Sequence, residues 1–161
     1  MKRGLTSNGP ARWMRRAMST RPPQSTPELE RCHAVCARFN AAPYYALLGM
    51  QAESYAPGTA RVTLRFDERL TQVYGKIHGG ALLSLADAAI NVALATTFEL
   101  GEVNATVELS MHFMAPAGKT SVVADGKLTH RGSRLAFAEC LLLSDGVPIA
   151  RAHGICHVRA D

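Results

Sequence analysis

The feature that most constrains this chain is a long apolar stretch, residues 80–98, which follows a loop ending in His78-Gly79-Gly80. A helix on a protein surface shows one apolar stripe, whereas this stretch is apolar most of the way round, as in a helix buried inside its domain. Ser84, Asp87 and Asn91 interrupt it, and their spacing places them on one stripe of a helix. Because desolvating a carboxylate costs free energy, Asp87 needs a partner or a purpose. We interpret this stretch as the centre of an active site.

The size and composition indicate an ordinary globular protein. The chain has 161 residues, enough for one domain with a core, and it is 47% hydrophobic and 19% charged. The apolar stretch is interrupted before it reaches the roughly 18 residues that a membrane span needs, so we expect no membrane segment. Its four cysteines show no paired framework, which favours reduced thiols and a cytoplasmic location.

The positive charge is concentrated at the beginning of the chain. Residues 1–27 contain six Lys and Arg and no acidic residue, which leaves 12 basic and 13 acidic residues in the remainder. Prolines, serines and threonines fill this segment, so we predict a disordered basic extension. An organelle transit peptide, or a true start at Met14 or Met18, are alternatives that stay open. The near-neutral remainder gives no reason to expect nucleic-acid binding by the domain.

The remaining periodicity predicts one domain, residues 28–161, of the α+β class. A short helix is expected before the first strands, and the long helix is expected to end near Gly101. Short turns between the later strands favour an antiparallel meander. One long helix against a sheet of about six strands is a two-layer arrangement. The expected elements are a helix at 28–40, the long helix at 80–98, and strands at 47–55, 59–66, 103–114, 119–130, 134–144 and 147–158.

A metal site is not expected. Cys32 and Cys36 with His33 are the residues that could suggest one. On a helix, however, His33 points away from the cysteine pair, and no second pair of ligands has a matching spacing. We therefore predict neither a metal nor a resident cofactor.

The Gly79-Gly80 junction can polarise a ligand's carbonyl group. The first N–H groups of a helix lack partners and lie at the positive end of its dipole, and glycine lets a ligand approach closely. A flexible hinge is the alternative reading of two adjacent glycines. Asp87 lies eight residues further along, which is about 12 Å of helix. A general base must come within about 3 Å of its proton donor, so Asp87 does not reach a carbonyl held at its own Gly79.

Two copies of the helix, packed antiparallel, would bring Asp87 of one copy to Gly79 of the other. The sequence therefore predicts a homodimer with a shared site, and the same packing would explain why the helix is apolar all round. The alternative is that Ser84, Asp87 and Asn91 form a buried polar seam between helices.

The run from Gly75 to Asp87, GKIHGGALLSLAD, resembles the signature of the hotdog-fold acyl-CoA thioesterases. The resemblance is to the phenylacetate-degradation (PaaI-like) branch of the 4-hydroxybenzoyl-CoA thioesterase superfamily. It covers about residues 45–158 and includes Phe113-Met-Ala-Pro-Ala117 and Arg131-Gly-Ser-Arg134. It implies the hotdog fold, in which an antiparallel sheet wraps a long central helix.

The resemblance also implies roles for single residues. Asp87 matches the catalytic carboxylate, which acts as a general base on water or attacks the thioester directly. The N–H of Gly79 matches the group that polarises the thioester carbonyl, and His78 matches a residue that shapes this loop and touches the substrate. Thr106 matches a hydroxyl that places the attacking water. Gln72 stands where relatives often carry an asparagine, a departure that leaves its role open.

Arg131, Gly132, Ser133 and Arg134 match a turn that lies near the coenzyme A tail. Arginine at such a turn suits phosphate recognition. The alternative for these four residues is a solvated hairpin turn.

The predicted function is hydrolysis of a small or medium acyl-CoA, aromatic acyl groups included, by a homodimer that pairs again into a tetramer. Coenzyme A is then part of the substrate and no cofactor is needed. Two alternatives stay open. One is a hotdog hydratase or dehydratase acting on acyl thioesters, with His78 transferring protons. The other is a non-catalytic acyl-CoA-binding protein whose arginine-rich extension binds nucleic acid.

Overall fold

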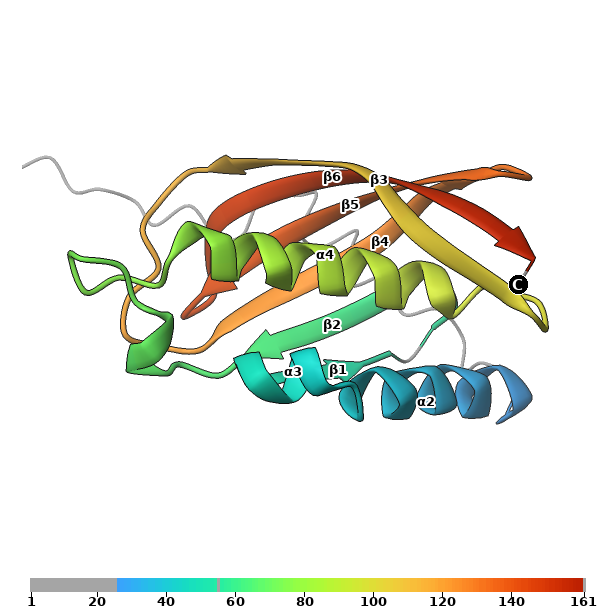
Figure 1. Ribbon diagram of the computed structural model, residues 1–161, viewed down its shortest axis with the longest axis horizontal. Helices are drawn as coiled ribbons and strands as arrows, with labels where there is room; N and C mark the ends of the chain where they lie inside the picture. The colour runs from blue at the N-terminus through green and yellow to red at the C-terminus, as the bar shows by residue number, and fades with distance from the viewer. Residues whose placement is uncertain (1–25, 55, 161) are drawn as a thin grey trace, which may run out of the picture.

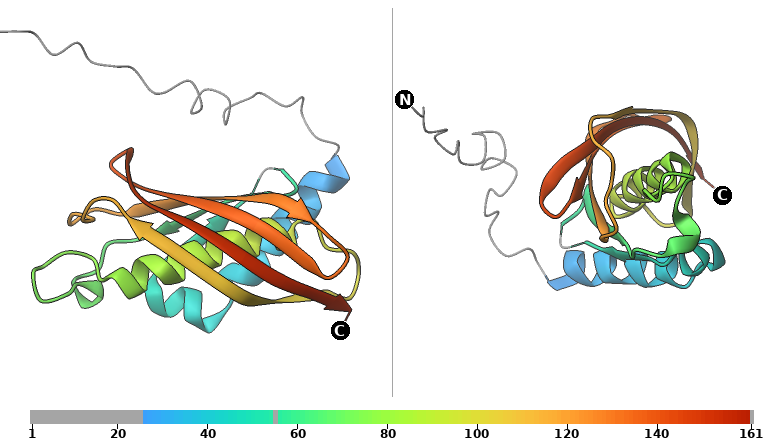
Figure 2. Two further views of the ribbon diagram at one scale, coloured as in Figure 1. Left: turned by 90° about the horizontal axis from the view of Figure 1, so that it is seen from above. Right: turned by 90° about the vertical axis from the view of Figure 1, so that its left-hand side faces the viewer.

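In the computed structural model, a curved sheet of six antiparallel strands wraps around one long helix, α4 (Figures 1 and 2). The structure describes residues 26–54 and 56–160. The basic extension predicted for residues 1–27 lies outside them, apart from residues 26 and 27, which belong to the first described helix. The end-on view in Figure 2 shows the strands around α4. The predicted α+β class and hotdog architecture are confirmed.

Most expected elements are present within a few residues of their predicted bounds. The exception is the start of the predicted strand 47–55, where a short helix ends at Leu48 and the strand begins only at Met50. The helices are α2 Thr26–Asn40, α3 Pro43–Leu48, the 3-10 helix η1 Glu68–Leu70, and α4 Gly79–Ala95. The strands are β1 Met50–Glu53, β2 Thr59–Leu64, β3 Glu102–Phe113, β4 Val122–Arg131, β5 Leu135–Ser144 and β6 Val147–Ala160.

The predicted meander is correct for β4, β5 and β6 but wrong for β3. The strand order is β1-β2-β4-β5-β6-β3, so β3 pairs with β6 at one edge of the sheet and does not pair with β4 (Figure 1). The segment with Pro116 is therefore a crossing connection and not a hairpin turn. Proline has no N–H for a strand ladder. The N–H groups of Met114 and Ala115 both donate to the carbonyl of Ile149, at 2.8 and 3.1 Å, which ties the start of the crossing to β6.

The core lies between α4 and the concave face of the sheet. Ten of the residues of α4 are buried, and they pack against β2, β4 and β5. Gly126 of β4 faces the helix so closely that a Cβ atom there would overlap the carbonyl oxygen of Ala89. Glycine is therefore required at this position for the helix to pack on the sheet. No helix within residues 26–54 and 56–160 combines the length and apolarity that crossing a membrane requires.

The long helix ends earlier than predicted, at Ala95 and not near Gly101. The buried hydroxyl of Thr96 donates to the carbonyl of Ala93 at 2.6 Å and accepts from the N–H of Gly58 at 2.8 Å. A hydroxyl bonded to a carbonyl of the last turn offers an alternative to continuing the helix. Gly101, with a φ of 82°, instead forms the turn before β3.

The two edges of the sheet differ. The β1 edge is four residues long, and the side-chain amide of Asn40 closes it by accepting from the N–H of Ala52 at 2.7 Å and donating to its carbonyl at 2.9 Å. The β3 edge is twelve residues long, and Val107 on it is 63% exposed. A long edge strand with apolar side chains is a ready surface for pairing with another chain.

Candidate active site

The polar stripe predicted on the long helix is present. Ser84, Asp87 and Asn91 are all partly exposed on one face of α4, while the opposite face is buried. The hydroxyl of Thr106, on β3, donates to Oδ1 of Asp87 at 2.8 Å. On the other side of the stripe, the hydroxyls of Tyr44, on α3, and Ser84 are hydrogen-bonded at 2.8 Å. Asp87 therefore lies on a face of α4 that is flanked by β3 and α3.

A directed set of hydrogen bonds fixes the orientation of Thr106. The amide nitrogen of Asn104 donates to Oδ1 of Asn91. The amide nitrogen of Asn91 donates to the hydroxyl of Thr106 at 3.1 Å and to the carbonyl of Asp87 at 2.8 Å. Because the Thr106 oxygen accepts this bond, its own proton is directed at Asp87. The second carboxylate oxygen, Oδ2 of Asp87, has no hydrogen-bond partner in the described part of the chain.

A β-bulge aims Asn104 and Thr106 at the helix. The pairing of β3 with β6 shifts between Thr106 and Glu108, so that Val107 is an extra residue in β3. Such an insertion reverses which side chains face the sheet's inner side. Asn104 and Thr106 reach α4 before the bulge, and Leu109 and Met111 pack on the core after it.

The start of α4 presents one free backbone donor. His78 is the N-cap, and its Nδ1 accepts from the N–H of Gly80 at 2.8 Å. The N–H groups of Ala81 and Leu82 both donate to the carbonyl of His78. The N–H of Gly79 has no acceptor among the described residues. Because Nδ1 of His78 accepts a hydrogen bond, the neutral imidazole carries its proton on the exposed Nε2. Gly79 therefore offers the unpaired donor that the sequence predicted.

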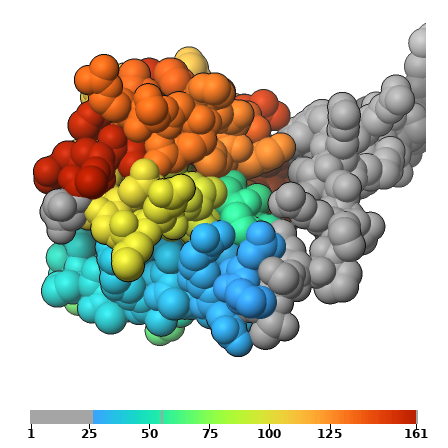
Figure 3. Space-filling model, turned by 90° about the vertical axis from the view of Figure 1, so that its right-hand side faces the viewer, coloured from blue at the N-terminus to red at the C-terminus, as the bar shows by residue number. Residues whose placement is uncertain are grey.

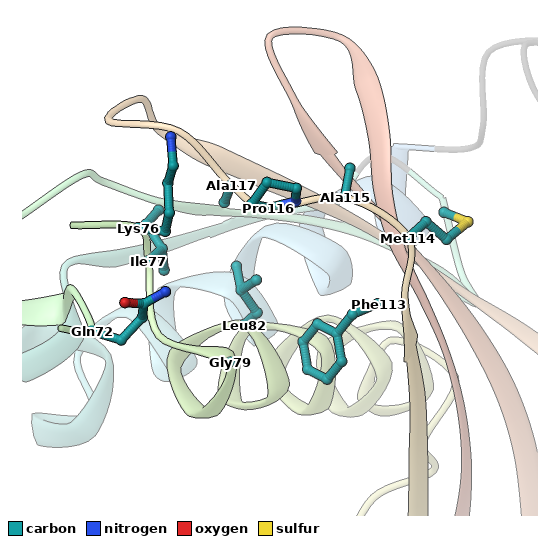
Figure 4. A pocket seen from close by; sticks show the side chains of 10 residues that line it. All are labelled: Gln72, Lys76, Ile77, Gly79, Leu82, Phe113, Met114, Ala115, Pro116 and Ala117. Carbon is teal, nitrogen blue, oxygen red and sulfur yellow. The ribbon is translucent and has the colours of Figure 1, made fainter. Parts of the chain in front are cut away.

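A cavity of about 360 Å³ opens beside Gly79, between the loop before α4 and the crossing segment after β3 (Figure 4). The amide oxygen of Gln72 accepts from the N–H of Tyr74, and Figure 4 shows its amide nitrogen turned toward Leu82. The ring of Phe113 stands over Gly79, 3.3 Å from where a Cβ atom would be. The cavity is lined by Gln72, Lys76, Ile77, Gly79, Leu82, Phe113, Met114, Ala115, Pro116 and Ala117.

The predicted coenzyme A turn lies at the other end of the helix. Arg131 to Arg134 form the β4–β5 hairpin, which Figure 3 shows in orange above the yellow segment that joins α4 to β3. Arg131 forms an ion pair with Glu102, in which its Nη2 donates to Oε1 at 2.6 Å. Ser133 and Arg134 are exposed. The N–H of Glu99 and then Arg131 hold the pKa of Glu102 below its usual value. One chain thus does not bring this hairpin to Gly79, because α4 is roughly 25 Å long.

Thiol chemistry at the site is disfavoured. Cys156 lies behind the stripe, with its sulfur 4.0 Å from Oδ1 of Asn91, and burial raises the pKa of its thiol. Burial also raises the pKa of Cys36 to about 11. A thiol acts as a nucleophile in its thiolate form, which these shifts oppose. Among the described residues, no three His, Cys, Asp or Glu side chains are grouped as metal ligands.

Sequence comparison places the chain in a known family. A model of the thioesterase superfamily matches residues 74–148. The protein PA0474 of Pseudomonas aeruginosa, provisionally named as an esterase, is 32% identical over 126 residues, which cover 74% of this chain and 91% of that protein. The 1,4-dihydroxy-2-naphthoyl-CoA hydrolase of Listeria monocytogenes is 28% identical over 85 residues, 53% of this chain and 69% of the hydrolase. A match to a Saccharolobus solfataricus protein spans 63% of that protein's length.

Solved structures agree on the fold. A thioesterase family protein from Silicibacter pomeroyi superposes with a TM-score of 0.74 at 23% identity, over 83% of this chain and 99% of that one. The PaaI protein of the Escherichia coli phenylacetic acid degradation operon gives a TM-score of 0.73 at 20% identity, over 80% and 94%. The chain belongs to the thioesterase superfamily and is classed with the thioester hydrolases.

Two features of the site were not found in the sequence. One is α3, which carries Tyr44 to Ser84; the available signal was Pro43, a residue common in the first turn of a helix. The other is Asn104, because only the bulge in β3 turns this strand's polar residues toward α4.

Proposed function

We propose that the chain hydrolyses acyl-CoA thioesters in a homodimer whose two sites each combine groups from both copies. The observation that carries this proposal is the unpaired N–H of Gly79, at a helix N-terminus and at the mouth of a largely apolar cavity. A donor in that position can stabilise the negative charge that develops on a thioester oxygen. The carboxylate of Asp87, with Oδ2 unpaired among the described residues, is available as the base.

The distance along the helix supports the need for a second copy. Gly79 and Asp87 are eight residues apart on one helix, about 12 Å along its axis. In an antiparallel pair of helices that places Asp87 against the partner's Gly79, residue 83 lies at the midpoint. Leu83 is 36% exposed, and the two elements that flank the polar stripe, α3 and β3, also carry exposed apolar side chains. A second copy would cover Tyr44, Leu47, Leu83, Val107 and Phe113.

The proposed reaction begins with the thioester carbonyl oxygen accepting hydrogen bonds from the N–H of Gly79 and the amide of Gln72. The partner's Asp87 takes a proton from water, and the water oxygen bonds to the carbonyl carbon as the C=O electrons move to oxygen. When the carbonyl reforms, the C–S bond breaks and its electron pair leaves with the thiolate, which takes up the proton that the partner's Asp87 accepted from the water. Thr106 holds the carboxylate through Oδ1, which leaves Oδ2 for the water.

Direct attack by Asp87 on the thioester, with an anhydride intermediate, is the other route for the same carboxylate. A single turnover in ¹⁸O-water tests the nucleophile route. The base route puts the label into the acid product, whereas attack by Asp87 followed by opening of the anhydride at Cγ of Asp87 delivers an unlabelled oxygen in the first turnover.

Several further parts of the proposal concern the substrate and its surroundings. A thioester is already activated, so a carboxylate and two donors suffice without metal or cofactor. A cavity of about 360 Å³ suits a small or medium acyl group, an aromatic one included, as expected of the PaaI-like branch. Arg134 and Ser133, both exposed, are the candidates for binding the coenzyme A phosphates.

The four unpaired thiols favour a location in the cytoplasm. Leu135 and Phe137, on the outer face of β5, offer a surface through which two dimers can pair into a tetramer.

The test is thiol release from acetyl-, butyryl-, octanoyl-, benzoyl- and phenylacetyl-CoA, measured with the wild type and with Asp87→Asn. We expect release by the wild type and at least a hundredfold less by the variant, as for loss of a general base. Equal release by both proteins would eliminate Asp87 as the catalytic carboxylate. Consumption of an enoyl thioester without thiol release would favour the hydratase alternative instead.

A further inference from the structure

The cavity beside Gly79 has a buried part and an exposed part with different chemistry. Its buried lining residues are all apolar, with Ile77 4%, Leu82 3% and Ala117 1% exposed. Its two polar side chains, Gln72 and Lys76, are less buried and come from the loop before α4. A group that enters the buried part therefore meets no hydrogen-bonding side chain.

The buried part starts close to the proposed carbonyl position. Leu82 follows Gly79 by three residues, one turn along α4, and its side chain points into the cavity toward Ala115 and Ala117 (Figure 4). The opposite wall is the crossing segment, which two backbone hydrogen bonds to Ile149 attach to β6. An acyl chain whose carbonyl lies at Gly79 would extend past Leu82 and end against Ala117, between two fixed walls.

We propose that Leu82 and Ala117 set the length of the acyl group, and that the group they select is apolar to its end. The proposal rests on the function proposed above and adds the class of acyl group. Ala117, which is buried, leaves room in the buried part because its side chain is a single methyl group. A terminal hydroxyl or carboxylate in this region would lose its water without gaining a side-chain partner, which is unfavourable.

The expected signature is a chain-length profile. Each methylene that moves from water into the buried part raises kcat/KM about fourfold until the cavity is full. A longer chain then gains nothing further. Phenylacetyl-CoA is expected to be preferred over its 4-hydroxy derivative by at least fivefold, within the roughly hundredfold that an apolar pocket achieves.

The experiment measures kcat/KM for saturated acyl-CoAs from two to twelve carbons with the wild type, Ala117→Leu, Ala117→Val and Leu82→Val. The two changes at Ala117 fill the buried part, so the longest well-hydrolysed chain becomes shorter by two or three carbons, with Leu acting more strongly than Val. Leu82→Val removes a methylene from the wall of the cavity, so the longest well-hydrolysed acyl chain becomes longer. Ala37→Leu, an exposed alanine on α2, is the matched control and keeps the wild-type profile.

The outcomes separate the two proposals. A wild type that releases thiol, with a profile that neither folded Ala117 variant nor Leu82→Val changes, overturns the assignment of these residues and leaves the thioesterase proposal standing. A preference for the 4-hydroxy substrate overturns the apolar class. If the wild type releases no thiol, the function itself fails, and thermal-shift binding of the same acyl-CoA series then decides whether Ala117 limits chain length. Ala117→Val is the milder variant should Ala117→Leu not fold.

Discussion

The hydroxyl of Thr106 donates a 2.8 Å hydrogen bond to Oδ1 of Asp87, joining an edge strand to a carboxylate on the central helix 19 residues earlier. Asn91 makes this bond directional, because its amide donates to the same hydroxyl. The carboxylate is thereby held in one orientation on a largely apolar helix. Asp87 consequently has both a partner and an unused oxygen, which is what a base at this position requires.

Replacing Thr106 should separate catalysis from binding. Thr106→Val removes the hydroxyl and keeps the shape, so we expect kcat to fall by about tenfold to a hundredfold with little change in KM, because the carboxylate loses its orientation. Thr106→Ser keeps the hydroxyl and should stay within a few-fold of the wild type. Steady-state kinetics with one acyl-CoA measures both constants. An unchanged kcat in Thr106→Val would contradict a role for the hydroxyl, and so would an equal loss of kcat in Thr106→Ser.

Thr96 should contribute more to stability than its neighbour Thr97. The hydroxyl of Thr96 is buried and accepts from the N–H of Gly58, whereas the hydroxyl of Thr97 bonds only the carbonyl of Leu94. Thr96→Val leaves the partly buried N–H of Gly58 without an acceptor, so we expect it to lower the free energy of unfolding by about 1–3 kcal/mol. Thr97→Val is the control, with an expected loss below about 1 kcal/mol. Urea unfolding of both variants measures the difference, and equal losses would refute it.

Gly126 should be intolerant of even one added methyl group. A Cβ atom there overlaps the carbonyl oxygen of Ala89, a backbone atom that moves only if α4 moves. We expect Gly126→Ala to lower the free energy of unfolding by about 3 kcal/mol or more. Substitutions that overpack a core typically cost about 1–3 kcal/mol, so this loss is at or above the top of that range. Gly118→Ala is the control, because nothing lies within 4 Å of its Cβ position. A thermal midpoint for Gly126→Ala equal to that of Gly118→Ala would show that the helix does not pack this closely.

The ion pair of Glu102 and Arg131 should make a pH-dependent contribution to stability. The N–H of Glu99 and then Arg131 lower the pKa of Glu102 from its ordinary value of 4.5. A lowered pKa in the folded state means that the stabilisation is complete above the unfolded-state pKa and is lost as pH falls through the folded-state pKa. Thermal midpoints of the wild type and Glu102→Gln should thus differ at neutral pH and converge in acid. A difference that grows as pH falls would have the wrong sign.

The parts of the fold that depend on local periodicity could be predicted. The apolar pattern of residues 80–98 identified α4, and the spacing of Ser84, Asp87 and Asn91 identified the stripe that faces Thr106. The bounds of β4, β5 and β6 followed from their alternation and turn residues. In each case the residues that decide the structure are close in the sequence, or they lie on one face of the same helix or strand.

The parts that depend on long-range pairing could not be predicted. The position of β3 beside β6, and not beside β4, is decided by partners more than 30 residues away in the chain. Strict alternation would turn Val107 toward the helix, whereas the bulge leaves it 63% exposed and selects Thr106 for the site. Six residues, as in α3, are too few to show a helical period.

The central claim, a site shared between two copies, can be tested by combining two inactive variants. Asp87→Asn removes the base. Gly79→Pro removes the N–H donor and adds a ring, and the start of the helix is kept because proline is tolerated at the first position of a helix and His78, at ψ 138°, already has the conformation that precedes proline. Gly79→Ala is the control, since it adds a Cβ atom but keeps the N–H.

The decisive measurement is thiol release by heterodimers of Asp87→Asn and Gly79→Pro chains, co-expressed with different tags and purified through both. If each site takes Asp87 from one copy and Gly79 from the other, every heterodimer has one intact site and regains about half of the wild-type turnover. If both groups act within one chain, each chain lacks one of them, and the heterodimer is as inactive as its parents.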